Sequence, residues 1–404
     1  MEQAISRDTQ EQPIATKKDH VIFLTVVFCF WFSTYIYIPV FGLYLEDIGF
    51  RYSLIGIILG SYGVTQILLR FPLGVVSDRL VGLRKQLLIF GFIMAFVSAL
   101  LLVFLPSFIG ILVARLLAGI TAAMWVMATV LYSQYFRTEH ASKAMSRVQF
   151  LTVFAQFTSM IISGYLVLYA GWTFPFWIAA VTAIVGLILA FQIKEVDVPT
   201  SKTSSTISTH VKETFHIYGL KTITFLSLVA HAILFITIFG FSPLYTTYFS
   251  TGDHAITILV CAFFIPHALA SVWLMFYKVD VERQKSVLLM SFALSALLLV
   301  ATPLANSLFF FSLIHAGIGL TLGVIFPLLL GMVIQLSSNG LKNSAMGFYQ
   351  SFYAIGILGG PLVAGELADK VNLPSVFFFS GLLSIIGFIV LIFFKANRNE
   401  KRSL

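Results

Sequence analysis

The sequence predicts an all-α membrane protein with twelve transmembrane helices, arranged as two pseudo-symmetric six-helix bundles. Three observations lead to this fold class: the composition, a series of long apolar runs and an internal repeat. Of the 404 residues, 59% are hydrophobic and only 10% are charged, whereas about 25% of the residues of a soluble domain are charged. So few charges cannot cover a soluble surface. The only two cysteines, Cys29 and Cys261, stand far apart, which excludes a disulfide scaffold and a four-cysteine metal site.

Twelve apolar runs follow the polar residues 1–20. A membrane-spanning helix needs about 20 mostly apolar residues. On that rule the sequence predicts helices at 21–45, 54–77, 87–105, 107–133, 148–170, 174–193, 222–249, 255–277, 287–304, 308–335, 344–367 and 375–394. The third and fourth helices are divided at Pro106, and the ninth and tenth at Pro303 and Asn306. No short apolar region with a small-residue cleavage site comes first, so we expect no cleaved signal peptide.

The basic residues indicate how the twelve spans are oriented. With both termini in the cytoplasm, 21 of the 25 Lys and Arg residues fall in cytoplasmic segments, and only Arg51 and Lys370 fall in outer loops. The remaining two, Arg70 and Arg115, lie inside spans. Because cytoplasmic loops carry the excess of basic residues, we expect a multi-pass protein of the cell (plasma) membrane with both termini cytoplasmic. The charge is dispersed over short loops, so we expect no nucleic acid partner.

The chain divides into five predicted parts. These are a cytoplasmic N-terminal tail (1–20), an N-terminal six-helix bundle (21–193), a cytoplasmic linker (194–221), a C-terminal six-helix bundle (222–394) and a cytoplasmic C-terminal tail (395–404). The linker is rich in Ser and Thr and too polar to order itself by burial. An internal repeat supports the division, because at an offset of 204 Pro39 matches Pro243 and Gly119 matches Gly323. Many secondary transporters consist of two repeated halves around a central binding site.

The predicted loop after the second helix carries a pattern of glycines and charges. Its members are Gly74, Asp78, Arg79, Gly82, Arg84 and Lys85. An acid at the cytoplasmic end of a helix, followed by bases, can form ion pairs across an interface in one conformation and lose them in another. We therefore expect these six residues to form an inner gate. The alternative is a basic cytoplasmic loop with one compensating acid.

The same loop resembles the signature loop of the major facilitator superfamily, with one additional residue between Arg79 and Gly82. A second motif of this family is similar to residues of the fourth helix, namely Ile111, Arg115, Gly119, Ala122 and Ala123. The resemblance, to the drug or metabolite and proton antiporter type, implies two six-helix bundles, a central cavity and alternating access. It also implies that Arg115 supports coupling to protons. The glycine-proline run of such antiporters is reduced here to Ser163 and Gly164, which weakens the antiporter interpretation.

Polar and aromatic residues inside the predicted spans are candidates for a solute cavity. A charged side chain at the centre of a span costs roughly 2.5 to 3.5 kcal/mol on insertion scales and normally faces the bundle interior. The candidates are Trp31, Tyr35, Gln66, Arg70, Gln149, Gln156, Tyr245 and Gln350. Arg70 and Arg115 lie at different depths, so we expect separate roles rather than one shared substrate group. Alternatively, Arg70 extends to the cytoplasmic face, and the outermost aromatic residues anchor the protein at the membrane interface.

Three histidines within the predicted spans, His231, His267 and His315, are candidate proton carriers. Histidine changes its charge near physiological pH, and none of the 17 acidic residues falls in the middle of a span. The three histidines are not paired at helical spacing, so we expect no metal site. The alternative, which single histidines inside a protein favour, is that hydrogen bonds within the protein satisfy the ring nitrogens of each.

These features predict a secondary active transporter that exports hydrophobic or amphipathic small molecules in exchange for protons. The alternative is a proton-coupled importer of a small organic anion, which the two buried arginines would suit. A membrane receptor or scaffold with the same fold is a third interpretation. The sequence contains no phosphate-binding loop, nucleophile elbow or zinc-protease motif, so we expect neither enzyme activity nor a cofactor. The expected partners are a small-molecule substrate, protons and the lipid bilayer, and we expect a monomer.

Overall fold

The computed structural model describes residues 15–76, 80–136, 141–196, 207–249, 254–277, 279–337 and 341–394, and all the regular structure in these ranges is helical. We call residues 15–196 the first half and residues 220–394 the second half. The first half contains α1 (Lys17–Tyr35), α2 (Ile38–Asp47), α3 (Tyr52–Val76), η1 (Val81–Leu83), α4 (Arg84–Phe104), α5 (Phe108–Ala123), α6 (Trp125–Ser133), α7 (Ala141–Ala170) and α8 (Phe174–Ala190).

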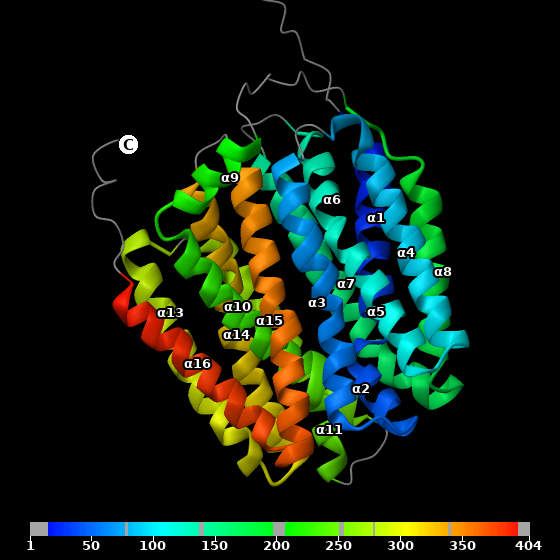
Figure 1. The fold of residues 1–404 in the computed structure, drawn as a ribbon, viewed down its shortest axis with the longest axis vertical. Coiled ribbons are helices and arrows are strands. Elements are labelled where there is room, and N and C mark those ends of the chain that lie inside the picture. The colour runs from blue at the N-terminus through cyan, green and yellow to red at the C-terminus, as the bar shows by residue number, and fades with distance from the viewer. Residues whose placement is uncertain are drawn as a thin grey trace, which may run out of the picture.

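The second half follows a short helix, α9 (Ile207–His216). It contains α10 (Leu220–Ile236), η3 (Thr237–Phe241), α11 (Ser242–Tyr245), η4 (Thr246–Phe249), α12 (Ala255–Phe276), α13 (Val281–Ala301), η5 (Thr302–Leu304), α14 (Leu308–Leu336), α15 (Lys342–Lys370) and α16 (Ser375–Phe393). Figure 1 shows these helices packed side by side in one layered bundle, with α4 and α8 at one side and α13 and α16 at the other.

The predicted fold class is confirmed. Within the described ranges, 11 helical segments are long and apolar enough to cross a membrane, and the apolar helix Phe174–Ala190 is a shorter twelfth candidate. Several segments extend beyond the apolar run that predicted them, because a helix continues where its side chains become polar. The clearest cases are α7 and α13, which begin at Ala141 and Val281 rather than near residues 148 and 287.

Helix starts follow from local chemistry that the two halves share. The Ser107 side chain accepts a hydrogen bond from the backbone of Gly110 at the start of α5, and Ser307 does the same for Phe310 at the start of α14. Such N-caps satisfy backbone N–H groups that have no partner within the helix. In lipid this matters more than in water, because an unpaired backbone group costs several kcal/mol there.

The two halves meet along α3 and α15, which run side by side through the centre of the bundle (Figure 1). Glycines allow this contact. A Cβ atom added at Gly63 would lie 2.7 Å from the carbonyl oxygen of Ala354, and one added at Gly74 would lie 2.8 Å from the Cα of Gly347. Small residues let transmembrane helices approach closely, so α3 and α15 form the tightly packed axis around which the candidate site is built.

The prediction that the whole linker lacks order is wrong for residues 207–216, which form α9. The ring of Phe215 contacts the rings of Phe71 on α3 and Phe348 on α15, with centroids 6.0 and 4.9 Å apart. The Phe215 ring thus packs against apolar residues of both halves, and the Ser and Thr content of the linker does not predict this contact. The helix covers one end of the α3 and α15 pair, the end at which the predicted loop after the second helix lies.

Candidate solute-binding site

Three membrane-crossing segments are interrupted within the membrane-spanning region. The first is interrupted at Tyr37 between α1 and α2, the fourth at Met124 between α5 and α6, and the seventh at the π-helical turn Thr237–Phe241. Pro39 and Pro243, the prolines matched by the repeat, stand in the first turns of α2 and α11, directly after two of the interruptions. Interrupted helices form the substrate sites of many transporters, and π-turns are frequent at functional sites.

Arg115 of α5 is buried beside the first interruption. It is 1% exposed, and its Nη1 donates a 3.3 Å hydrogen bond to the hydroxyl of Tyr37. The guanidinium lies over the rings of Tyr62 and Phe41, 4.6 and 5.4 Å from their centroids. Cation–π contacts of a desolvated arginine contribute about 2 kcal/mol, so aromatic groups stabilise this charge. The Nε of Arg115 has no hydrogen-bond partner.

Arg70 of α3 is buried beside the second interruption and is 3% exposed. Its Nη1 donates a hydrogen bond to the hydroxyl of Tyr353 on α15, and its Nη2 donates one of 3.2 Å to the carbonyl oxygen of Ala122, just before the break at Met124. The guanidinium therefore bridges the two halves instead of extending to the cytoplasmic face. Its Nε, like that of Arg115, has no hydrogen-bond partner.

In the part of the chain that the structure describes, neither arginine forms an ion pair with a carboxylate. Four of the described acids, Glu46, Asp47, Glu366 and Asp369, stand near helix ends at one end of the bundle. A buried donor without a partner costs about 1–3 kcal/mol, and more when it is charged. The interior of the bundle is therefore positively charged, with unused N–H groups on both guanidinium groups.

Tyr353 connects Arg70 to one of the three histidines. The rings of Tyr353 and His231 are stacked, with centroids 3.8 Å apart and an interplanar angle of 1°. The Nδ1 of His231 lies 2.8 Å from the carbonyl oxygen of Ser227, and the Ser227 hydroxyl donates a 2.8 Å hydrogen bond to the hydroxyl of Tyr349. Of the three histidines, His231 is the one that contacts a partner of a buried arginine.

Aromatic side chains from both halves form a wall next to the arginines. The rings of Trp31 and Trp125 are 5.0 Å apart, Trp31 and Tyr35 are 5.6 Å apart, and Tyr35 and Phe239 of the π-turn are 5.3 Å apart, centroid to centroid. Tyr35 also lies close enough to Arg70 and to Arg115 to interact electrostatically with both. The Nε1 of Trp31 has no hydrogen-bond partner. We call Trp31, Tyr35, Trp125 and Phe239 the aromatic wall.

The other predicted cavity residues lie at varying distances from this cluster. Gln66 is buried and donates to the carbonyl oxygen of Tyr62, one turn before it on α3. Gln350 is also buried, and its Oε1 has no partner. Gln149 is exposed and Gln156 half-buried on α7. Tyr245 lies elsewhere: its ring packs against Phe311 and Phe377 within the second half, with centroids 5.3 and 5.1 Å away.

The remaining two histidines have different surroundings. His315 is fully buried, and its Nδ1 and Nε2 lie 2.8 Å from the carbonyl oxygen of Phe311 and from the hydroxyl of Ser242, respectively. Because Ser242 directly follows the π-turn, His315 fixes the interruption of the seventh segment. The Nδ1 of His267 lies 3.2 Å from the carbonyl oxygen of Gly319, and its ring stacks on Phe263.

The structure describes four of the six residues of the predicted inner gate, because Asp78 and Arg79 lie outside the described ranges. Gly74 packs on α15 as described above, and nothing lies within 4 Å of a Cβ added at Gly82. Arg84 is buried. The Nζ of Lys85 donates a 2.9 Å hydrogen bond to the carbonyl oxygen of Ile193 after α8. Lys85 therefore holds two segments of the same half together.

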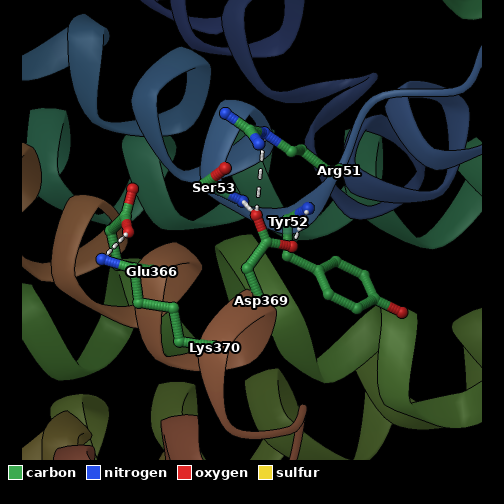
Figure 2. A network of polar contacts seen from close by, with 6 residues as sticks. All are labelled: Arg51, Tyr52, Ser53, Glu366, Asp369 and Lys370. Carbon is green, nitrogen blue, oxygen red and sulfur yellow. Dashed lines mark hydrogen bonds and ion pairs between the residues drawn. The ribbon is translucent and has the colours of Figure 1, made fainter.

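At the opposite end, a network of polar contacts joins the halves (Figure 2). The carboxylate of Asp369 on α15 accepts 2.9 Å hydrogen bonds from the backbone N–H groups of Tyr52 and Ser53, which open α3. Arg51 lies 4.0 Å from the same carboxylate. An acid at a helix N-terminus is stabilised by the free N–H groups and by the helix dipole. Asp369 thus caps a helix of the other half and links the two halves at this end.

Sequence reasoning missed the partners of the arginines. Tyr37, Tyr62 and Tyr353 each contact a guanidinium, yet tyrosines are common in apolar runs and only a contact map shows which of them meet a charge. The available signal was the repeat: the matched prolines Pro39 and Pro243 mark two of the three interrupted segments, and residues beside such interruptions are the first candidates for a site.

The fold is that of a multi-pass helical membrane protein built from two halves. The family profile described as Major Facilitator Superfamily matches residues 23–252 and 223–404. The chain belongs to this superfamily, which confirms the resemblance found in the sequence.

Similar proteins are bacterial transporters. The chain is 23% identical over 397 residues to Multidrug resistance protein 2 of Bacillus subtilis (strain 168), covering 95% of this chain and 97% of that protein. It is 21% identical over 417 residues to the proton-coupled antiporter flippase LtaA of Staphylococcus epidermidis, covering 98% and 100%. A shorter match, 32% identical over 151 residues and covering 37% of each chain, is to an uncharacterized transporter of Buchnera aphidicola.

A solved structure of the nucleoside transporter NupG has the same fold. The TM-score is 0.70 at 16% sequence identity, and the match covers 94% of this chain and 99% of NupG. At this identity the similarity shows the fold alone.

Proposed function

We propose that this transporter exports hydrophobic or amphipathic small molecules in exchange for protons, by alternating access to a site between its halves. The observation that carries the proposal is the hydrogen bond from the buried Arg70 to Tyr353, which joins the two halves beside the aromatic wall. A solute bound there touches both halves, so its binding can change their relative arrangement. The similarity to a multidrug resistance protein and to a proton-coupled antiporter supports the same direction and coupling.

In this proposal, the described contacts belong to a conformation whose outer end is closed. Asp369 caps α3 there, and a Cβ added at Gly42 of α2 would lie 3.2 Å from the carbonyl oxygen of Gly240 in the second half. Export requires these contacts to break. In this proposal the inner gate consists of Gly74, Asp78, Arg79, Gly82, Arg84 and Lys85.

Proton coupling is assigned to Arg115 together with a titrating group close to the site. Among the histidines, His231 is the best placed carrier, because its ring lies against the residue that holds Arg70. His315 has both ring nitrogens engaged, and the ring of His267 lies 6.1 Å from that of Phe326, which in turn contacts His231. Loading His231 with a proton would place a third positive charge beside the arginines and so favour release of a cationic solute or retention of an anionic one.

Import of a small organic anion is the second candidate function. The observation that favours it is the absence, among the described residues, of a carboxylate paired with Arg70 or Arg115. An anion would balance the buried charge. In this alternative the solute and the proton move inward together rather than in opposite directions.

The placement in the membrane is part of the proposal. We assign both termini and the inner gate to the cytoplasm and the Asp369 end to the outer face of the plasma membrane, on the distribution of basic residues. The two six-helix bundles, 21–193 and 222–394, are assigned as the moving bodies, and a monomer is the transporting unit.

Vesicles of opposite orientation test the direction. Ethidium, Nile red and 1-naphthyl phosphate are offered as cationic, neutral and anionic solutes to inside-out and right-side-out vesicles with an imposed proton gradient. An exporter accumulates at least one solute in inside-out vesicles whose interior is acidic, and a protonophore abolishes the accumulation. Accumulation only in right-side-out vesicles with an acidic exterior would establish the importer, and vesicles without the protein provide the background.

A further inference from the structure

We propose that Arg70 binds the anionic head group of an amphipathic solute, and that the aromatic wall holds the apolar part. The inference deepens the proposed function and rests on it: it names the chemical class of the transported molecule as one with a phosphate, sulfonate or carboxylate group on an apolar body. It applies whether the solute moves outward or inward.

The guanidinium of Arg70 is fixed in position, and one of its N–H donors has no hydrogen-bond partner. Tyr353 and the carbonyl oxygen of Ala122 each accept one hydrogen bond from the two terminal nitrogens, so the plane of the group is set by partners from α15 and from the break in the fourth segment. The Nε–H has no partner although the residue is 3% exposed. A planar, preoriented guanidinium with free N–H groups is the arrangement that recognises oxyanions.

Tyr353 supplies a further donor at the same place. Its hydroxyl oxygen accepts the hydrogen bond from Arg70, which leaves its own proton to donate. The stack of its ring on His231, at 3.8 Å and 1°, holds the hydroxyl in place. An oxyanion next to Arg70 would therefore meet N–H and O–H donors from the two halves at once.

The charge around the site selects against cations. Arg115 is 1% exposed, also has an unpartnered Nε–H, and interacts electrostatically with Tyr35, as does Arg70. No acid within the described ranges pairs with either arginine. A cationic solute would enter a region that already holds two uncompensated positive charges, whereas an anion would lower its electrostatic energy.

The apolar part of the solute has a defined surface next to Arg70. Trp125 follows Ala122 by three residues, and its ring meets that of Trp31 at 5.0 Å. Tyr35 continues the wall to Phe239 in the other half. Flat aromatic faces accept apolar groups of many shapes, while the unpartnered Nε1–H of Trp31 offers a donor to a polar group beyond the head.

A purely structural role for Arg70 makes different predictions. If Arg70 only ties α3 to α15, its removal lowers stability and affects solutes of every charge alike. If it binds the head group, removal weakens binding of anionic solutes selectively. The charge of the solute therefore separates the two roles.

The test is isothermal titration calorimetry on the full-length protein in dodecyl maltoside, with 1-naphthyl phosphate, 1-naphthol and 1-naphthylmethylammonium. The three probes share one aromatic body and differ in head-group charge. The wild type is expected to bind the phosphate at least tenfold more tightly than the ammonium compound. Arg70→Gln is expected to lose at least tenfold in affinity for the phosphate and to bind naphthol within twofold of wild type. Arg70→Lys is expected to recover part of the loss.

Arg283→Gln is the matched control, because Arg283 is exposed on α13 far along the chain from the site, with a side chain 81% exposed. It should bind the phosphate like wild type. Equal or tighter binding of the ammonium compound by wild type would overturn the inference even if Arg70→Gln failed to fold. Wild-type affinity of a folded Arg70→Gln for the phosphate would overturn it as well.

Binding in detergent is independent of proton coupling and of direction. Binding of 1-naphthyl phosphate through Arg70, without accumulation of any solute in either vesicle orientation, would support the inferred site and contradict the proposed transport function. Gradient-driven export of ethidium without binding of 1-naphthyl phosphate would support the transport function and contradict the inferred site.

Discussion

Arg70 of the first half, which is 3% exposed, donates a hydrogen bond to the half-buried Tyr353 of the second half. The contact joins α3 and α15, the two helices that pack along their length (Figure 1). A buried cation whose partners come from both halves is sensitive to any movement between them, so its environment must differ between conformations that face opposite sides.

Tyr353→Phe removes the hydroxyl and keeps the ring that stacks on His231. Arg70 then loses an acceptor inside the bundle, which should lower the free energy of unfolding by about 1–3 kcal/mol. The measurement is the Tm of the purified protein in detergent. Phe352→Leu, a change beside it on α15 that leaves the polar contacts intact, serves as the control. An unchanged Tm for Tyr353→Phe would mean that the hydrogen bond contributes nothing to the described conformation.

Asp369→Ala removes the cap that α15 places on the start of α3 (Figure 2). Two backbone N–H groups and the positive end of the helix dipole lose their partner, which amounts to roughly 0.5–2 kcal/mol for an N-cap. We expect the equilibrium to shift towards a conformation with an open outer end. Spin labels on the outer ends of α2 and α11 should show a longer distance by pulsed electron resonance.

Lys370→Gln is the control for that change, since Lys370 contacts only Glu366 of its own helix in the network of Figure 2, at 2.9 Å. It should leave the distance distribution as in wild type. Identical distributions for Asp369→Ala and wild type would show that the cap does not hold the outer end closed.

Gly63→Val tests the packing of α3 on α15. The added Cβ would lie 2.7 Å from the carbonyl oxygen of Ala354 and 2.8 Å from the backbone nitrogen of Leu358, so the helices must separate. Overpacking of this kind typically costs 1–3 kcal/mol, and the Tm should fall accordingly. Gly359→Val on α15 is the matched control, because nothing lies within 4 Å of its added Cβ. Equal effects of the two substitutions would contradict the close contact.

His315 and Ser242 should behave as one structural unit. Their hydrogen bond fixes the start of α11 after the π-turn. His315→Gln and Ser242→Ala are each expected to lower the unfolding free energy by about 1–2 kcal/mol, and the double variant by less than the sum, since groups in direct contact are coupled. Chemical unfolding of the four proteins measures this. Full additivity would show that the two groups are not coupled, whereas a loss of proton coupling with unchanged stability would make His315 a candidate proton carrier.

The fold could be predicted from the sequence because length and hydropathy determine a transmembrane helix almost alone. Both buried arginines could also be singled out, since a charge within an apolar run is rare. Their partners could not be predicted. Tyr353 lies 283 residues from Arg70 in the chain, and the acceptor at Ala122 is a backbone carbonyl that a sequence does not distinguish from its neighbours.

The linker and the outer end show a different limit of sequence reasoning. Phe215 orders part of a polar segment by packing on Phe71 and Phe348. The average composition of the segment does not indicate this contact. Asp369 could be assigned to an outer end, but its role as the cap of α3 depends on where two helices of different halves meet. Such relations follow from tertiary packing and not from local pattern.

The central claim is that the buried cluster between the halves couples solute movement to proton movement, and Arg115 tests it most directly. Proteoliposomes with a pH-sensitive dye inside receive the cationic, neutral and anionic solutes in turn, for wild type and Arg115→Ala, with solute binding measured on both proteins. The account predicts solute-triggered proton movement for wild type and its loss in a folded Arg115→Ala that still binds solute. Proton movement of wild-type size in Arg115→Ala, or none in wild type for any solute that it binds, would contradict it.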